Sequence, residues 1–200
     1  MAGFKYNLNP ETEKVERYDV QTGIRRRGPY ALDIANIPNG AKLPSFAPIY
    51  ADLKNKKCYL VRNIKVAEAY TTGDDNKVIK VAKGSFPYVG MIIGNGSKGA
   101  TVASIDTTDA KFDAVTLEAA FGANLKEGDV LFEATAAGGT KQKYTANSAL
   151  YENYTVSNDI STTHLVALLR TAAEIEPEKL VIPFSENDKE ALQGWFQFNE

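Results

Sequence analysis

Residues 88–105, which read YVGMIIGNGSKGATVASI, decide the fold class. Two runs that contain β-branched residues flank the dipeptide Asn95-Gly96, and both residues of this dipeptide tolerate the positive φ that a tight hairpin requires. The stretch therefore predicts two antiparallel strands joined by a tight turn at Asn95-Gly96.

The same stretch contains glycines at positions 94, 96 and 99, in the G-x-G-x-x-G spacing of dinucleotide-binding loops. Such a site needs a helix directly after the glycines, because the amides at the helix N-terminus hold the pyrophosphate. Residues 100–105, ATVASI, have no helical periodicity, and Lys98 does not have the spacing of a P-loop lysine. We therefore predict a hairpin here and no nucleotide site.

Short runs rich in Val, Ile, Tyr, Phe and Thr continue on both sides and alternate with clusters of Gly, Asn and Asp. Several short strands at this spacing favour a mainly β fold, a small antiparallel β-barrel or sandwich, over an alternating βαβ fold. We assign residues 48–134 to this domain. The runs expected to form strands are 58–61, 64–70, 78–82, 88–93, 101–105, 114–117 and 130–133.

Residues 1–47 are predicted to form an irregular N-terminal arm, because prolines and glycines interrupt every periodic pattern. Within them, Arg25, Arg26, Arg27 and Tyr30 form a compact basic and aromatic cluster. This cluster is either a solvated charge run or a partner-binding site for an acidic protein surface. We expect the arm to be poorly ordered alone or packed on a neighbouring subunit, since it has too few periodic apolar residues for a core.

Residues 135–200 are predicted to form a linker and a C-terminal α/β extension. Residues 165–173 fit a helix and a strand equally well. Ser185 and Asp188 match a capping box, which predicts a short helix over 186–194. Trp195, Phe196 and Phe198 follow it, and on a monomer they would leave an exposed apolar patch. We expect them either to form an oligomer interface or to dock on the chain's own barrel.

The composition excludes several classes of protein. Lys and Arg number 23 against 25 Asp and Glu, and the net charge of −2 gives no drive toward nucleic acid or anionic membrane. With one cysteine, Cys58, and one histidine, His164, the chain cannot form an internal disulfide or a Cys/His zinc cluster. We expect Cys58 to be a buried apolar filler and His164 to be structural.

The N-terminus lacks the apolar segment of a signal peptide, and no run approaches the roughly 20 apolar residues of a membrane span. We therefore expect neither secretion through a signal peptide nor membrane insertion.

Asp106, Asp109 and Asp113 are spaced like a loose calcium loop, but the glycine and the distal glutamate of an EF-hand are missing. We predict no metal site, no cofactor and no catalytic residue.

A series of segments between Tyr50 and Ala134 has a distinctive order. The segments are IKVAE at 64–68, VIKV at 78–81, KG at 83–84, VGMIIG at 89–94, SID at 104–106, FDAVTL at 112–117 and LKEGDVL at 125–131. In this order the chain resembles the head fibre proteins of tailed bacteriophages and, more loosely, small capsid decoration proteins. The likeness covers under half of the chain and rests on strand and turn patterns.

The resemblance implies a structural virion protein that binds the exterior of the capsid, often as a homotrimer, with the phage major capsid protein as its partner. It implies a location on the virion surface after synthesis in the cytoplasm of the bacterial host, and it brings no catalytic residue.

Two other interpretations stay open. One is a carbohydrate-binding adhesin module that uses Tyr144, Tyr151 and Tyr154 as stacking platforms for a host-surface glycan. The other is a hydrolase that works with paired carboxylates, which would require a deep pocket holding two carboxylates of shifted pKa.

Overall fold

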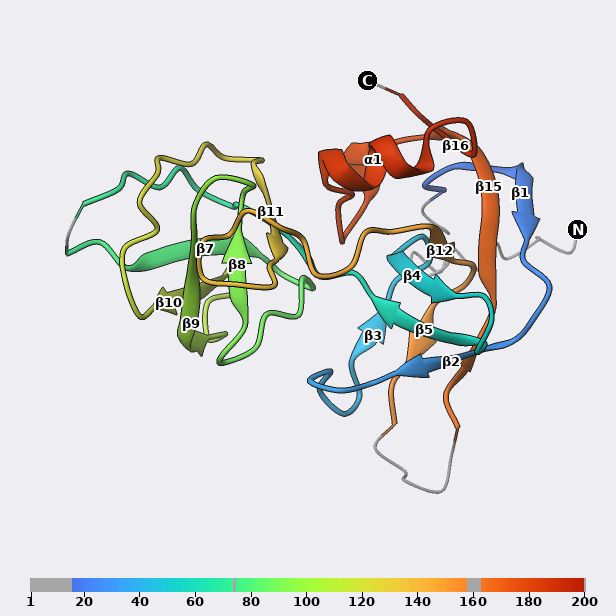
Figure 1. The fold of residues 1–200 in the computed structure, drawn as a ribbon, viewed down its shortest axis with the longest axis horizontal. Coiled ribbons are helices and arrows are strands. Elements are labelled where there is room, and N and C mark those ends of the chain that lie inside the picture. Colours follow the sequence, from blue (N-terminus) through green and yellow to red (C-terminus); the bar gives the residue numbers. More distant parts are fainter. Residues whose placement is uncertain (1–15, 74, 158–162, 200) are drawn as a thin grey trace, which may run out of the picture.

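The computed structural model describes residues 16–73, 75–157 and 163–199, and its fold is mainly β, as the sequence predicts (Figure 1). Two lobes lie side by side. The chain crosses between them twice, so a central segment forms one lobe and the two flanking segments together form the other. We call residues 63–142 the barrel module, and residues 16–62 together with 143–199 the host module.

The barrel module is a six-stranded antiparallel sheet. A bridge between Val66, just after the first strand of this sheet, and Val81 joins the two edge strands, so the sheet curls back on itself. The predicted barrel is confirmed. In spatial order the strands are β6 (Asn63–Lys65), β11 (Val130–Glu133), β8 (Ile92–Gly94), β9 (Gly99–Asp106), β10 (Phe112–Leu117) and β7 (Val78–Ala82).

Alternation along the strands builds the core of the barrel module. In β10 every second residue is buried, and in β7 the side chains of Ile79 and Val81 are fully buried. A strand places successive side chains on opposite faces, so this period of two puts one row of apolar side chains inside. The main apolar cluster of this module extends from Ile64 to Leu131.

A tight turn joins β8 and β9 as predicted, but its central residues are Gly96 and Ser97, and Asn95 does not have a positive φ. The Asn95 N–H donates to the Lys98 carbonyl at 3.0 Å, the Asn95 side-chain oxygen accepts from the Ser97 N–H at 3.1 Å, and Gly96 has a φ of +90°. Gly99 begins strand β9 rather than a helix, so the glycine pattern does not form a dinucleotide-binding loop.

The glycines of this pattern have a packing role instead. Gly94 and Gly99 face each other across the hairpin, and a Cβ at either position would lie 2.5 Å from the Cα of Gly139. The Gly96 N–H also donates to the Gly139 carbonyl at 2.9 Å. Residues 94 and 99 must therefore be glycine so that the returning chain can pack against the hairpin.

Replacing Gly139 by alanine is expected to lower the free energy of unfolding by about 2–4 kcal/mol. Gly139 has a φ of +64°, and an added Cβ would clash with the backbone carbonyl of Lys98. The matched control is Gly138→Ala, because a Cβ at Gly138 meets nothing within 4 Å. Urea denaturation of both variants checks this, and equal stabilities would contradict the packing role.

The host module is an eight-stranded sheet that combines strands from both ends of the chain. Pairing is antiparallel except for the β2–β5 and β15–β16 pairs, which are parallel. In spatial order the strands are β1 (Asp19–Arg25), β15 (Leu168–Ile175), β12 (Ser148–Leu150), β4 (Pro48–Asp52), β5 (Lys57–Leu60), β2 (Tyr30–Asp33) and β14 (Leu165–Val166), with β16 (Phe196–Phe198) beside β15. A small pair, β3 (Lys42–Leu43) and β13 (Tyr154–Thr155), accompanies the sheet.

The expectation of an irregular arm over 1–47 is wrong for its second half. Leu32, Ile37 and Leu43 are buried in the host core, and Phe46 is 1% exposed. These strands have only two to four residues, so no periodic pattern develops in the sequence although their side chains are buried. Residues 1–15 of the expected arm lie outside the described residues.

The boundary of the barrel also differs from the expected residue 48. Strands β4 and β5 pair with β12 and β2 of the host sheet, and the barrel begins at Asn63. The sequence of the β4–β5 hairpin does not show to which sheet it belongs. Its neighbouring strands, β12 and β2, are not adjacent to it in the sequence.

The C-terminal segment resolves the two open questions about its secondary structure. Residues 165–173 form strands β14 and β15 rather than a helix. The capping box of Ser185 and Asp188 is confirmed, and it starts helix α1 (Glu186–Leu192), after a short 3-10 turn at Pro177–Lys179. No helix in the described part of the chain is long and apolar enough to cross a membrane.

Asp188 also connects the two modules. Its carboxylate is fully buried and accepts hydrogen bonds from the side-chain amides of Asn63, at 2.6 Å, and Gln142, at 3.0 Å. It also accepts from the backbone N–H groups of Ala146 and Ser185, at 2.7 and 3.0 Å. Asn63 and Gln142 lie where the chain enters and leaves the barrel module, so one carboxylate fixes both crossings to helix α1.

Candidate functional site

Two arginines of the predicted basic cluster are exposed at an edge of the host sheet. Arg25 ends strand β1, and its guanidinium lies 4.5 Å from the ring centroid of Tyr151. Arg27 is exposed, and its carbonyl oxygen accepts a hydrogen bond from Lys56 Nζ at 2.9 Å. Both charges are therefore available to a partner.

The other two residues of that cluster are used inside the host module. Arg26 donates from Nε to Ser148 Oγ at 3.1 Å and from Nη2 to the Asn147 carbonyl at 2.6 Å. Tyr30 is 2% exposed, and its hydroxyl accepts from Lys56 Nζ at 3.2 Å. These two side chains make hydrogen bonds that stabilise the host module.

The aromatic C-terminus folds back onto its own chain. Phe196 is 4% exposed and lies 6.5 Å from Phe184, measured between ring centroids, while Phe198 lies 5.2 Å from the same ring. Trp195 remains 49% exposed, with the Arg170 guanidinium 4.7 Å from its ring centroid. Of the three aromatics expected at an oligomer interface, Trp195 is exposed, Phe198 is half-buried and Phe196 is buried.

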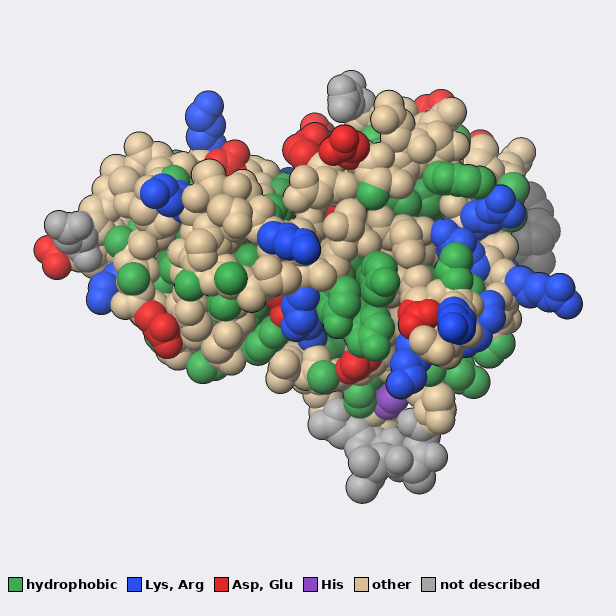
Figure 2. Space-filling view, viewed as in Figure 1, with side chains coloured by type: hydrophobic (Ala, Val, Ile, Leu, Met, Phe, Trp, Pro, Cys, Tyr) green, Lys and Arg blue, Asp and Glu red, His purple; other side chains and the backbone are tan. Residues whose placement is uncertain are grey.

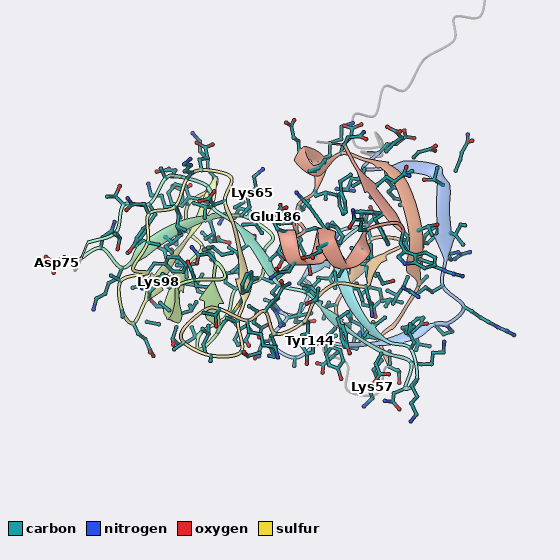
Figure 3. All side chains as sticks on the ribbon, turned by 45° about the horizontal axis from the view of Figure 1, so that its top comes forward. Lys57, Lys65, Asp75, Lys98, Tyr144 and Glu186 are labelled. Atoms are coloured by element: carbon teal, nitrogen blue, oxygen red, sulfur yellow. The ribbon has the colours of Figure 1, made fainter. Side chains whose placement is uncertain are left out.

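The three tyrosines expected as a stacking platform do not lie together. Tyr151 lies under Arg25, and the Tyr154 hydroxyl is 2.8 Å from Nδ1 of His164. His164 is 6% exposed, so it lies inside the host module. Tyr144 belongs to a different group of aromatic side chains beside the junction of the two modules (Figure 3).

This group, which we call the tyrosine cluster, consists of Tyr50, Tyr59 and Tyr144. Tyr50 and Tyr59 are cross-strand partners in β4 and β5. The Tyr144 ring stacks on both, at centroid distances of 5.3 and 4.9 Å and interplanar angles of 20° and 17°. All three side chains are half-buried, and none of their hydroxyls forms a hydrogen bond within the described residues. Figure 2 shows hydrophobic side chains gathered over β4 and β5, with Lys and Arg side chains nearby.

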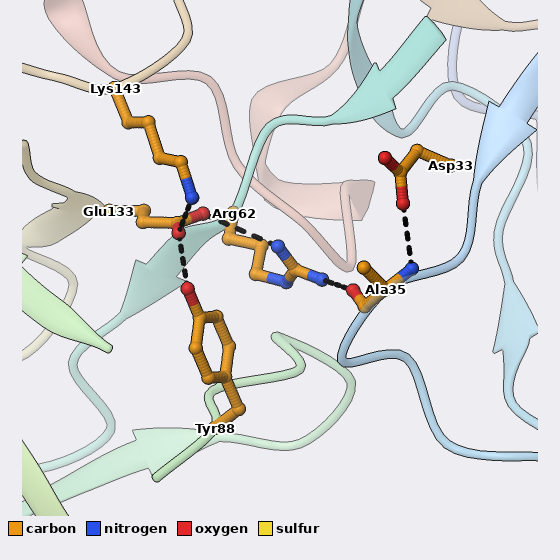
Figure 4. Close-up of polar contacts among 6 residues, drawn as sticks. All are labelled: Asp33, Ala35, Arg62, Tyr88, Glu133 and Lys143. Carbon is orange, nitrogen blue, oxygen red and sulfur yellow. Dashed lines mark hydrogen bonds and ion pairs between the residues drawn. The ribbon is translucent and has the colours of Figure 1, made fainter. Parts of the chain in front are cut away.

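A buried ionic network lies next to the tyrosine cluster and joins the modules (Figure 4). Arg62 Nη1 lies 3.3 Å from Glu133 Oε2, and Arg62 Nη2 donates to the Ala35 carbonyl at 2.6 Å. The other Glu133 oxygen accepts from the Tyr88 hydroxyl at 2.6 Å and from Lys143 Nζ at 2.7 Å. Arg62 Nε is buried and has no hydrogen-bond acceptor in the described part of the protein.

A hollow of about 70 Å³ lies beside the network and the rings, and Lys143 Nζ lies 5.6 Å from the Tyr144 ring centroid. Its lining includes Asp33, Asn36, Arg62 and Lys143, together with the side chains of two cluster tyrosines. One oxygen of the exposed Asp33 accepts from the Ala35 N–H at 2.8 Å, which leaves its second oxygen without a partner among the described residues. The hollow thus brings together two tyrosines and a free carboxylate oxygen.

The network alters the pKa values of its members. Burial alone would raise the pKa of Glu133, but hydrogen bonds from Lys143 and Tyr88 and the charge of Arg62 outweigh it, so the pKa is lowered. Burial opposes the charge on Lys143, yet the bond to Glu133 raises its pKa. Burial and the bond to Glu133 raise the pKa of Tyr88. All three groups therefore keep their ordinary charge states at neutral pH.

We expect the contribution of Glu133 to stability to disappear in acid. Because its pKa is lowered on folding from the ordinary value of 4.5, the unfolded chain binds more protons and stability rises with pH in this range. The contribution is complete above pH 4.5 and is lost as the pH falls through the lower folded-state value. Glu133→Gln should therefore cost about 2 kcal/mol near neutral pH and much less near about pH 3.

Denaturant unfolding at several pH values measures this difference. The control is Glu127→Gln, since Glu127 is an exposed carboxylate of the same module. A stability difference between the Glu133 variant and the unaltered protein that is constant with pH would contradict the assigned cause.

The remaining candidates from the sequence have structural roles. Oδ1 of Asp106 and Oδ1 of Asp109 each accept a backbone N–H two residues later, at 2.9 and 2.7 Å, and Asp113 pairs with Lys83 at 2.5 Å. No group of three or more His, Cys, Asp or Glu residues that could hold a metal ion occurs among the described residues. Cys58 is fully buried, as expected, and burial together with the charge of Asp33 raises its pKa to about 12.

A larger cleft of about 400 Å³ lies between the modules on the side of helix α1. Lys65 of the barrel module and Glu186 of α1 both line it (Figure 3). The hydrogen bonds of Asp188 join the two modules, and this cleft lies in a part of the junction that they do not fill.

Sequence reasoning missed Tyr50, Tyr59, Asp33 and Arg62 as site residues. A signal for the first two exists, because residues 48–60 form a hairpin around Asp52 to Lys57 that makes Tyr50 and Tyr59 partners. No local pattern brings Tyr144 to them, because it arrives after the whole barrel module.

The chain matches one family model, described as "head fiber protein", over residues 2–197. No curated protein and no solved structure matches it.

Proposed function

This chain belongs to the phage head fiber protein family, and we propose that it attaches to the outer surface of the capsid as a homotrimer. The family is one of structural proteins, so the chain is a structural protein of a phage. The match over nearly all of the chain extends to both modules, whereas the resemblance in the sequence covered mainly the barrel.

The observation that carries the proposal is the composition of the exposed edge strand β1. Within the described residues, β1 is the last strand on its side of the host sheet. Val20 and Ile24 on this strand are 55% and 59% exposed, and the exposed Arg25 and Arg27 stand at and just after its C-terminal end. Exposed apolar side chains next to unpaired cations are typical of a surface that binds an acidic protein partner. We assign this edge to the capsid contact.

Attachment to capsids that lack this protein tests the assignment. The double variant Arg25→Ser, Arg27→Ser is expected to bind about tenfold more weakly at low salt and to show a weaker dependence on salt. Arg26 is left unchanged because it holds Ser148 and Asn147. The control is Lys126→Ser with Lys141→Ser, two exposed cations of the barrel module. Equal attachment of both double variants would remove the role of β1.

We assign part of the trimer contact to Trp195. Its indole is half exposed although large aromatic side chains are usually covered, and Arg170 holds it in place by a cation–π contact. Light scattering should give about three times the 21.8 kDa chain mass, and Trp195→Ser should shift the population toward monomer. A monomeric mass of the unaltered protein at micromolar concentration would defeat the trimer.

We also propose that the chain has no catalytic activity. The pKa values of Asp52, Asp106 and Glu133 are all lowered, the opposite of what a general acid needs at neutral pH. The thiol of Cys58 stays protonated and buried.

A further inference from the structure

We propose that the tyrosine cluster and the adjoining hollow form a binding site for a neutral saccharide. This goes beyond capsid attachment, because the cluster belongs to β4, β5 and the chain leaving the barrel module, and not to strand β1. The two functions can therefore be separated by substitution.

The stacked rings supply the apolar platform. A pyranose ring has one face of C–H groups, which packs on an aromatic face, while its hydroxyls point outward at the edges. The rings of Tyr50, Tyr59 and Tyr144 are held in place by each other and remain half-buried. Their hydroxyls have no hydrogen-bond partners among the described residues, so each can bind a sugar hydroxyl without breaking an existing bond.

The hollow supplies a hydrogen-bond acceptor. This acceptor is the free oxygen of the exposed Asp33, which lines the hollow. A sugar hydroxyl can donate to this oxygen, and a bond to a charged group is stronger than a neutral one. A hollow of about 70 Å³ holds only a few hydroxyl-sized groups, so the sugar ring itself must lie over the tyrosines.

The charge balance selects a neutral ligand. Arg62 and Lys143 are both paired with Glu133, and Asp33 brings a second carboxylate to the hollow. Two cations therefore face two carboxylates, and the formal charge of the group is zero. A phosphate, a sialic acid or a uronic acid would meet Asp33 without an unpaired cation to offset the repulsion.

The polar groups are already fixed in position. Arg62 is held by Glu133 and by the Ala35 carbonyl, and Asp33 is held by the Ala35 N–H. Asn36, which follows directly, adopts a φ of +57° that places this segment against Arg62 and Tyr59. A site ordered in this way loses little conformational entropy on binding.

The test uses the full chain on an array of neutral oligosaccharides built from hexoses and N-acetylhexosamines, with sialylated and uronic acid oligosaccharides beside them. We expect binding to neutral probes only. Titration calorimetry with the best free neutral oligosaccharide should then show binding about tenfold weaker or more for Tyr144→Ala and for Asp33→Asn, and nearly unchanged for Tyr144→Phe, which keeps the ring.

Two control variants match these changes. Tyr151→Ala removes another half-buried tyrosine outside the cluster, and Asp109→Asn alters an aspartate whose Oδ1 accepts the N–H two residues later, as that of Asp33 does. Both controls should bind like the unaltered protein, and circular dichroism verifies that every variant is folded.

Several results would overturn the proposal. These are the absence of binding to every neutral probe at concentrations up to about 10 mM, binding to anionic probes only, and unchanged binding by folded Tyr144→Ala. If Tyr144→Ala abolishes attachment to capsids and leaves sugar binding intact, the tyrosine cluster is a protein interface and the saccharide assignment is wrong. Failure of the Arg25 and Arg27 variants to affect attachment would leave the saccharide proposal standing.

Discussion

Replacing Asp188 by alanine is expected to lower the free energy of unfolding by about 3–5 kcal/mol. The carboxylate accepts hydrogen bonds from Asn63, Gln142, Ala146 and Ser185, and all of these donors are buried with it or beside it. Removing the acceptor leaves buried N–H groups without partners, and each of them loses the solvation that it had in the unfolded chain.

Asp188→Asn should recover only part of this loss, because one oxygen becomes an NH₂ group that faces other donors. The control is Glu190→Ala, an exposed acid on the same helix, which should change stability by less than about 0.5 kcal/mol. Urea denaturation measures all three variants. Equal effects of the alanine substitutions at 188 and 190 would show that the buried carboxylate does not couple the two modules.

Replacing Phe46 by alanine is expected to cost about 3–5 kcal/mol. Its ring lies 4.8 Å from Tyr18, 5.7 Å from Phe184 and 5.6 Å from Phe196, measured between centroids, so it joins both ends of the chain in one aromatic core. Phe46 also has a φ of +66°, which is strained for any residue with a Cβ. Phe46→Gly should therefore be no less stable than Phe46→Ala, because glycine removes the backbone strain.

Phe86→Ala is the matched control for Phe46. Phe86 has a similar φ of +54° but is only half-buried, so its loss should cost clearly less. Thermal or urea unfolding separates the three variants. A small effect at Phe46 would mean that the N-terminal segment is an independent arm, as its sequence alone predicts.

The sequence predicts the barrel module well and the host module poorly. The runs at 78–82 and 130–133 coincide with β7 and β11, because both are short apolar runs bounded by turn residues and their partners lie within the same module. Strand β15 could not be told from a helix, since its alternation is interrupted where Leu168 and Leu169 are both buried. Its neighbours β1 and β12 come from distant parts of the chain, so no local signal identifies them.

The candidate site could also be predicted only in part from the sequence. Residue types alone identified Tyr144 as a possible platform, but Tyr151 and Tyr154 were grouped with it only because they are close in sequence. The structure instead joins Tyr144 to Tyr50 and Tyr59, which precede the barrel module. The site combines residues from before and after the barrel module. Its members can therefore be identified only when the path of the whole chain is known.

The insertion of one module into the other also sets an order of events during synthesis. All six strands of the barrel lie between Asn63 and Glu133, so this module can close as soon as that segment has left the ribosome. The host sheet pairs Asp19 with Ala173 and Ala172 with Phe196, so it cannot close before residue 196 has been translated. Its early strands must therefore wait beside an already folded barrel, with Leu32, Ile49 and Phe46 uncovered, until strand β16 completes the core.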